Sequence, residues 1–204
     1  HGTSAISAYV LCKQELNWKQ KIAKWLTGDE FNKYDYLWSS RSVIKNSTIN
    51  KEKGVDFYGE DIWCVVKKEV EHLIPKGISL YGEICGYTPE NKMIQKGYDY
   101  FCKEREHMFM VFRITQTNVD GHTIEFTPTQ IKTFCDSRGL KHSEYIKFFG
   151  ELSTFLPMKE GEDLEIWRIR LYDYLKELYT EKDCSLCVNK VPEEGIVLRI
   201  EDGN

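Results

Sequence analysis

A turn signal between two strand-like runs constrains the fold of this chain more than any other feature. Asp120-Gly121 separates a continuous hydrophobic run at residues 108–115 from a shorter one at 123–126. An Asp-Gly pair between two such runs is typical of a β-hairpin, whose two strands are antiparallel. The chain is therefore expected to build at least part of its core on an antiparallel sheet.

Strands and helices follow one another along the rest of the chain without a regular βαβ alternation. Runs rich in β-branched and aromatic residues predict further strands at residues 6–11, 36–44, 78–85 and 195–200. Helical spacing predicts helices at 17–26, 61–73, 128–136 and 163–180, although 17–26 also fits a pair of strands. Residues 54–60 have the composition of a loop. This order predicts an α+β fold of largely antiparallel sheets flanked by helices.

Composition excludes several classes of protein. The 204 residues are 41% hydrophobic, which suits one domain with a substantial core, and the net charge of −4 argues against a protein that coats nucleic acid non-specifically. An odd count of seven scattered cysteines indicates a reduced, cytoplasmic protein. There is no membrane-spanning run and no signal peptide, so we expect no membrane association. There is also no initiator Met, so we expect a fragment or a processed segment.

Four short islands of sequence carry the groups with chemical potential. They are His1-Gly2-Thr3-Ser4 before a strand, Ser39-Ser40-Arg41-Ser42 within a predicted strand, Leu80-Tyr81-Gly82-Glu83-Ile84-Cys85-Gly86, and Glu193-Glu194-Gly195-Ile196-Val197-Leu198-Arg199. In the third island, Glu83 lies in the middle of an apolar strand, where a carboxylate is costly to bury without a partner. The glycines on either side would let a ligand approach the backbone closely. This combination suits a hydroxyl-rich ligand such as a ribose.

The second and fourth islands offer complementary groups. Glu194 is predicted to stand at the mouth of the strand at 195–200, and Arg41 offers a planar fork for phosphate or ribose oxygens. Together with Glu83 these side chains would hold a sugar, a phosphate and a divalent metal. Oxygen ligands favour Mg²⁺ or Mn²⁺.

In this order, the four islands resemble motifs I, Ia, III and IV of the superfamily of RNA ligases and DNA ligases, and residues 109–114 resemble motif IIIa. His-Gly-Thr at 1–3 resembles motif I of the editing-ligase branch of RNA ligases, which reads Lys-x-His-Gly. The resemblance implies that residues 1–204 form a single nucleotidyltransferase domain, the adenylation domain of an ATP-dependent RNA ligase. It places the nucleophilic lysine two positions before His1 and motif V after Asn204.

The resemblance also implies a reaction and a role for each residue. The lysine would attack the α-phosphate of ATP, the AMP would pass to an RNA 5′-phosphate, and a 3′-hydroxyl would displace it to seal the RNA during repair. Glu83 would bind the ribose, and Phe112 would stack on the adenine. Glu194 would assist the metal and the catalytic environment of the nucleophile. His1, Ser4 and Arg41 would lie near the phosphates, the ribose or the RNA end, and Gly2 and Arg199 complete the expected nucleotide contacts.

Several alternatives stay open at this point. Arg113 stands where the family usually has Asp after the stacking aromatic, and Phe109 competes with Phe112, although strand alternation puts their rings on opposite faces. Without the motif order, Phe112 reads as core, Arg41 as a surface residue, and Glu83 and Glu194 as exposed acids. A DNA ligase, a GTP-using capping enzyme or a non-catalytic relative that binds nucleotide or RNA would share the pattern. The expected partners are ATP and RNA ends, bound by a monomer.

A separate signal is Cys184-Ser185-Leu186-Cys187. A Cys-x-x-Cys pair is typical of zinc or redox sites, but a tetrahedral zinc site needs two more ligands. The histidines at 107, 122 and 142 are not paired at ligand spacing, and there is no second Cys-x-x-Cys. A plain loop is the favoured interpretation, and a zinc-binding interaction protein is the third functional alternative.

Overall fold

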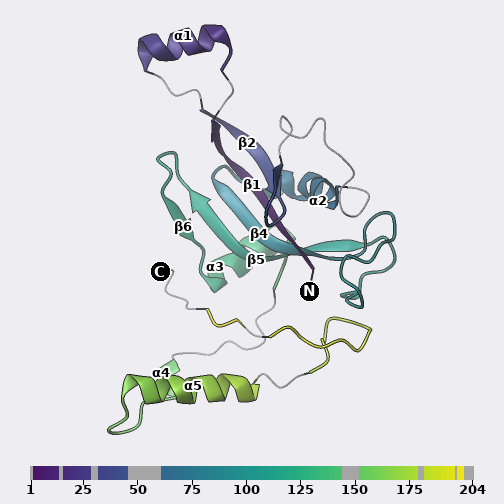
Figure 1. Cartoon of the computed structure of the whole chain (residues 1–204), viewed down its shortest axis with the longest axis vertical. Helices are drawn as coiled ribbons and strands as arrows, with labels where there is room; N and C mark the ends of the chain where they lie inside the picture. Colours follow the sequence, from purple (N-terminus) through teal and green to yellow (C-terminus); the bar gives the residue numbers. More distant parts are fainter. Residues whose placement is uncertain are drawn as a thin grey trace.

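The architecture is α+β, built on one mixed sheet. The computed structural model describes residues 2–13, 16–28, 32–45, 61–143, 152–178, 182–195 and 197–199. Among these residues, seven strands form a sheet in the order β3-β2-β1-β4-β5-β6, and β7 also pairs with β5 (Figure 1). Every neighbouring pair is antiparallel except β5 with β7. The predicted class and the largely antiparallel pairing are confirmed.

The strands follow the predicted runs closely in the middle of the chain. Their bounds are β1 Thr3–Lys13, β2 Asn32–Ser39, β3 Ile44–Lys45, β4 Ile78–Gly86, β5 His107–Thr117, β6 Thr123–Glu125 and β7 Lys141–His142. The hairpin expected around Asp120-Gly121 is present, with Thr115 opposite Glu125 and Thr117 opposite Thr123. The loop predicted at 54–60 lies outside the described residues.

Three of the described helices begin after a residue whose side chain caps the first turn. The helix bounds are α1 Trp18–Thr27, α2 Ile62–Val70 with a 3₁₀ turn at Glu71–Leu73, α3 Pro128–Asp136, α4 Leu152–Phe155 and α5 Leu164–Leu178. Asn17 and Thr127 each form a reciprocal capping box with the glutamine three residues on, and the Asp61 side chain accepts from the Cys64 amide. The helical alternative for 17–26 is therefore the correct one.

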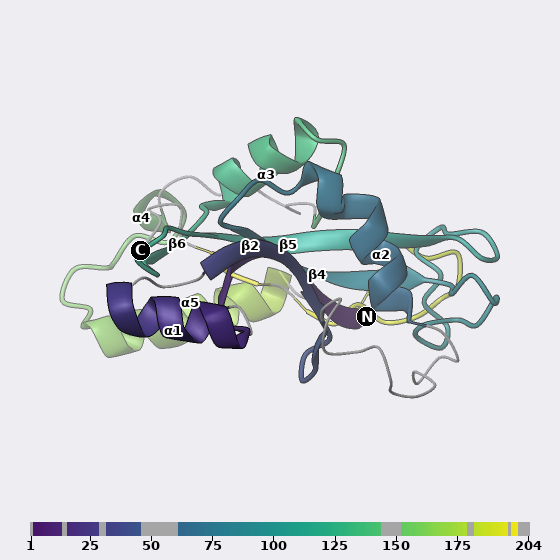
Figure 2. The ribbon, with the colours of Figure 1, turned by 90° about the horizontal axis from the view of Figure 1, so that it is seen from above.

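The main core lies on one face of the sheet, beneath α2 and α3 (Figure 2). The strands contribute Leu80, Ile84, Val111 and Ile114, all fully buried, and the helices contribute the list Ile62, Val66, Val70, Ile131 and Cys135. Burying such side chains stabilises the fold by about 1.5–3 kcal/mol each. The helices thereby occupy one face of the central strands, and the other face carries a mixture of polar and apolar side chains.

Two helices lie away from this core. β1 pairs with β4 only as far as Ala8, and α1 follows the part of β1 that extends beyond this point (Figure 1). None of the residues of α1 is buried. In α5 the predicted apolar stripe is only half-buried at Trp167, Leu171 and Leu175, and Leu164 is exposed. The prediction that this stripe is a core face is therefore wrong for the described part of the helix. Residues 179 and 180, the last two of the predicted helix, lie outside the described residues.

Two predicted strand segments have a different structure. Residues 40–43 form a turn between β2 and β3, because the Ser40 amide donates to the Val43 carbonyl and the Ser40 hydroxyl accepts from the Ser42 and Val43 amides. Arg41 therefore lies in a turn and not in a strand. The strand predicted at 195–200 is also wrong where it is described: Gly195 and residues 197–199 have no strand pairing, and Val197 and Leu198 are exposed. Residues 196 and 200 lie outside the described residues.

Candidate nucleotide site

The sheet surface opposite α2 and α3 brings together Ser4 and Glu83, two of the polar side chains that the sequence singled out. Ser4 of β1 is opposite Glu83 of β4, Glu83 is opposite Met110 of β5, and Tyr81 is opposite Arg113. Directly opposed residues of antiparallel strands share a face. We call the surface formed by Ser4, Tyr81, Glu83, Met110 and Arg113 the site face.

The start of β1 is fixed from both sides. On the core side, the indole Nε1 of Trp63 in α2 donates to the Ser4 carbonyl at 2.9 Å. On the other side, a Cβ added to Gly2 would stand 2.6 Å from the carbonyl oxygen of Ile84 in β4. Gly2 is thus required by the close approach of two backbones, and this approach holds Ser4 beside Glu83. His1 lies outside the described residues.

A β-bulge sets the direction of the side chains in β5. The register passes from Tyr81 opposite Arg113 to Gly82 opposite Val111, which leaves Phe112 without a partner. Val111 and Ile114 are both buried in the core, so Phe112 and Arg113 both turn to the site face. Phe109 is buried and Phe112 is 36% exposed, so Phe112 is the ring of the two that a ligand on this face can reach.

Arg113 is the centre of a charged network that the sequence did not reveal. Its guanidinium lies 2.8 Å from the Glu125 carboxylate and 4.8 Å from the centre of the Tyr81 ring. Arg199 approaches the other Glu125 oxygen at 3.6 Å. The hydrogen bond to Glu125 raises the pKa of the Arg113 guanidinium, so this side chain stays charged. Tyr81 and Glu125 were missed because their contact with Arg113 depends on strand register, although Tyr81 shares the alternation of Glu83.

Glu194 is exposed and comes from a segment that is held at the side of the sheet. Pro192, two residues earlier, accepts a hydrogen bond from the Tyr98 hydroxyl at 2.9 Å. Burial, neighbouring thiols and the Glu194 carboxylate together raise the pKa of the Tyr100 hydroxyl. Because Tyr100 packs against Cys85, two residues along β4 from Glu83, Glu194 lies toward the Cys85 end of β4.

The structure revises the expected roles of two glycines and of Arg41. The space beside Gly82 is filled by the Phe109 ring, and that beside Gly86 by Cys102, so neither glycine leaves room for a ligand. Arg41 is exposed in its turn, two residues past Ser39, which pairs with Ile6. The turn therefore lies at the same end of β1 as Ser4, but no described contact joins Arg41 to the site face.

The site face has the groups to bind a nucleotide through hydrogen bonds, stacking and charge. Glu83 and the Ser4 hydroxyl are suited to sugar hydroxyls, Phe112 to a base, and the two arginines to phosphate. The carboxylates of Glu83 on this surface, Glu125 beside Arg113 and Glu194 toward the Cys85 end of β4 offer oxygen atoms as metal ligands. Among the described residues, no group of three or more His, Cys, Asp or Glu side chains is already arranged to hold a metal ion.

A shallow hollow elsewhere in the molecule is separate from this surface. It is lined by Val10 and Leu11 of β1 and by residues 117–121 of the β5–β6 turn, at the end of β1 away from Ser4. It has a single carboxylate, Asp120, and none of the groups predicted from the motifs.

Comparison with known proteins gives no family assignment. No protein-family model matches the chain, and no curated protein matches it significantly. Within the described ranges, no helix has the length and apolar character needed to cross a membrane. The function of the chain must therefore be argued from the order of its motifs and from the site face.

Proposed function

We propose that the chain is the adenylation domain of an ATP-dependent RNA ligase with the nucleotidyltransferase fold. The observation that carries the proposal is the pairing of Ser4 with Glu83. These residues come from the first and third islands, 79 positions apart, and they meet side by side on a sheet face that also presents Phe112 and Arg113. If the short motifs resembled the family only by chance, there would be no reason for them to lie side by side on one sheet face.

The arrangement supports a division of roles on the site face. Glu83 accepts hydrogen bonds from the ribose hydroxyls, and Phe112 stacks on the adenine. Arg113 and Arg199 flank Glu125 and supply positive charge for phosphates or for an RNA end. This replaces the family's Asp after the stacking aromatic with an Arg that is paired with Glu125. Glu194 supports Mg²⁺ or Mn²⁺ that arrives with ATP.

Nucleotide binding by the chain itself tests the first half of the proposal. In isothermal titration, the affinity of a Glu83→Gln variant for ATP should be about tenfold to a hundredfold lower than that of the parent chain, because hydrogen bonds to a charged group contribute about 1.5–3 kcal/mol. Glu104→Gln, an exposed acid in the loop after β4, is the matched control and should bind like the parent. Equal affinity of the two variants would place the ribose elsewhere.

Stacking on Phe112 is tested separately. Phe112→Ala should weaken ATP binding by about 1–3 kcal/mol, the range for an aromatic side chain stacked on a base. Phe112→Tyr keeps the ring and should retain most of the affinity. If Phe112→Ala and Phe112→Tyr bind ATP equally well, the adenine does not stack on this residue.

Covalent transfer separates the remaining alternatives. A version of the chain extended upstream to the expected lysine should acquire label from α-³²P ATP and pass it to an RNA 5′-phosphate. Label from GTP alone would indicate a capping enzyme, and transfer only to DNA would indicate a DNA ligase. ATP binding without any covalent label, or a residue other than lysine two positions before His1, would indicate a non-catalytic relative.

A further inference from the structure

Four of the seven cysteines meet in one small cluster beside the sheet. Cys85 from the end of β4, Cys102 from the loop after it, and Cys184 and Cys187 from the segment after α5 pack together with Tyr98 and Tyr100. The other three cysteines, at positions 12, 64 and 135, lie elsewhere. The sequence interpretation sought two further ligands for Cys184 and Cys187 among histidines. The structure brings two cysteines to the pair instead.

The contacts within this cluster place the thiols close to one another. The Cys187 amide donates to the Cys184 carbonyl at 3.3 Å, which folds the Cys-x-x-Cys segment into a tight turn, and the two thiols are within hydrogen-bonding reach. Gly86, with a φ of 94°, brings the backbone against Cys102: a Cβ there would stand 2.6 Å from the Cys102 Sγ. The Cys85 thiol is near enough to those of Cys102 and Cys187 for each to disfavour its ionisation.

The segments that supply Cys102, Cys184 and Cys187 have little regular secondary structure, and hydrogen bonds such as that from the Tyr98 hydroxyl to the Pro192 carbonyl join them. Residues 87–106 and 182–195 contain only isolated bridges, and Tyr100 and Phe101 adopt left-handed backbone angles that bulky residues rarely adopt. Only three side chains of the cluster are buried, and four of its nine members are cysteines. A core of this size stabilises little on its own, and small units of this kind are commonly fixed by disulfides or by a metal.

We propose that Cys85, Cys102, Cys184 and Cys187 form a tetrahedral structural zinc site. Four thiols bind one Zn²⁺ as thiolates, and four protons are released, with no change of oxidation state. The thiols are not already arranged around a common point, so binding requires them to move toward one centre. The site ties the segment that carries Glu194 to the end of β4, two residues from Glu83.

Metal analysis of the full chain tests the proposal. The protein is purified with reductant and without chelator, equilibrated with micromolar Zn²⁺ and dialysed. Elemental analysis should find about one zinc per chain, as expected for a single four-thiolate site. The double variant Cys184→Ser/Cys187→Ser should lose it. Cys12→Ser/Cys64→Ser, which alters two half-buried cysteines outside the cluster, should keep it.

A second measurement on the unaltered chain guards against variants that fail to fold. Replacing Zn²⁺ with Co²⁺ should give the intense visible bands and the thiolate charge-transfer absorption of tetrahedral sulfur ligation, and Zn²⁺ should abolish both. Binding at pH 7 should release about four protons per ion. Absence of zinc from the unaltered chain, an octahedral cobalt spectrum, or a mass two units lower that shows a disulfide among these cysteines would each overturn the proposal.

Discussion

At the scale of single residues, Gly82 marks a close approach between neighbouring strands of the sheet. Gly82 faces the Met110 carbonyl and the Phe109 ring, each 2.5 Å from where a Cβ would stand. The sequence correctly marked the position as special, but it could not say which group comes close. A glycine in a strand signals a close approach equally well for a ligand or for the protein's own side chain.

Gly82→Ala is therefore expected to destabilise the fold by about 1–3 kcal/mol through overpacking, measured as the free energy of unfolding in urea. Phe109→Leu makes room on the ring side of this contact. The double variant should then lose about 1 kcal/mol less than the sum of the two single variants, because the two sites are in direct contact. Strict additivity would show that the Phe109 ring does not fill the space at Gly82.

Some site residues have positions that follow from strand alternation, and others depend on a turn or on the strand register. Ser4 and Glu83 lie in strands that the composition predicts well, so alternation alone places their side chains on one face once the strands are paired. Arg41 depends on a turn made by hydroxyl and amide contacts of Ser40, which compete with strand pairing. The pairing of Arg113 with Glu125 depends on the register and on a bulge, and neither leaves a signal in the sequence.

At the scale of elements, α2 connects the core to the site face. It buries one apolar face, and the Trp63 indole reaches through to the Ser4 carbonyl. Trp63→Phe keeps an aromatic ring but removes this hydrogen bond. We expect a loss of about 0.5–1.5 kcal/mol in the free energy of unfolding.

Trp18→Phe is the matched control, because the Trp18 side chain in α1 is 68% exposed. Its free energy of unfolding should be unchanged within experimental error. ATP affinity should fall for Trp63→Phe only, since the start of β1 loses its anchor. If Trp18→Phe destabilises the chain as much as Trp63→Phe, the hydrogen bond to Ser4 does not contribute to stability.

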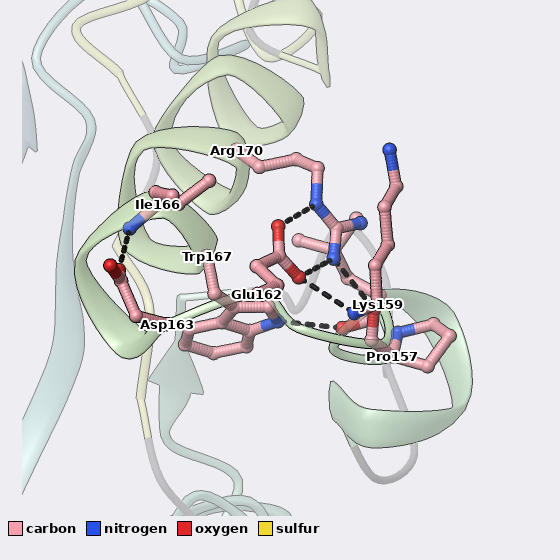
Figure 3. A network of polar contacts seen from close by, with 8 residues as sticks. Pro157, Lys159, Glu162, Asp163, Ile166, Trp167 and Arg170 are labelled. Atoms are coloured by element: carbon pink, nitrogen blue, oxygen red, sulfur yellow. Dashed lines mark hydrogen bonds and ion pairs between the residues drawn. The ribbon is translucent and has the colours of Figure 1, made fainter.

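The junction between α4 and α5 is held by a carboxylate that responds to acid. Glu162 accepts two hydrogen bonds from Arg170, at 2.8 and 2.7 Å, and one from the Lys159 amide (Figure 3). The bond with Arg170 and then the bond with the amide lower the pKa of Glu162 from 4.5 to about 2. A lowered pKa stabilises the folded junction above pH 4.5, and this contribution is lost as the pH falls toward 2.

The indole N–H of Trp167, which donates to the Leu156 carbonyl at 2.8 Å, reports on this junction. Its NMR resonance should stay constant from pH 7 to about 4.5 and then move as Glu162 protonates toward pH 2. In Glu162→Gln the resonance should show no such titration. A midpoint near 4.5 in the parent chain would mean that Arg170 does not hold the carboxylate in solution.

Elements with local signals were predictable, and elements that depend on distant partners were not. The Asp-Gly turn is a local signal, and so are the capping side chains of Asn17, Asp61 and Thr127 at the starts of three predicted helices. The apolar run at 195–200 has strand composition, yet its described residues have no neighbouring strand to pair with. The stripe of α5 has core periodicity, but periodicity cannot state whether a partner surface is present.

At the scale of the whole molecule, residues almost a hundred positions apart join the C-terminal segment to the loop after β4. Tyr98 donates to the Pro192 carbonyl, the Val188 amide donates to Asp99, and Asn189 donates to the Gly97 carbonyl. The order of the strands could not be predicted either, because β1 pairs with both β2 and β4 across long intervening segments.

Tyr98→Phe should loosen this attachment without affecting the helices on the core side. Removing one hydrogen bond of about 1 kcal/mol should speed hydrogen exchange at the Cys184 and Glu193 amides by about fivefold. Amides of α3 should be unaffected. Tyr172→Phe, an exposed tyrosine of α5, should change neither region, and faster exchange throughout the chain would instead indicate a general loss of stability.

The close approach at Gly82 has a consequence for the register in which β4 and β5 pair. A strand that slides by two residues keeps its inward and outward pattern, so hydrophobic burial alone does not prevent this error. In β4 and β5, however, the Met110 carbonyl needs a residue without a side chain opposite it, and between Ile78 and Ile84 only Gly82 qualifies. A β5 shifted by two residues would drive that oxygen against Leu80 or Ile84, so Gly82 favours the observed register.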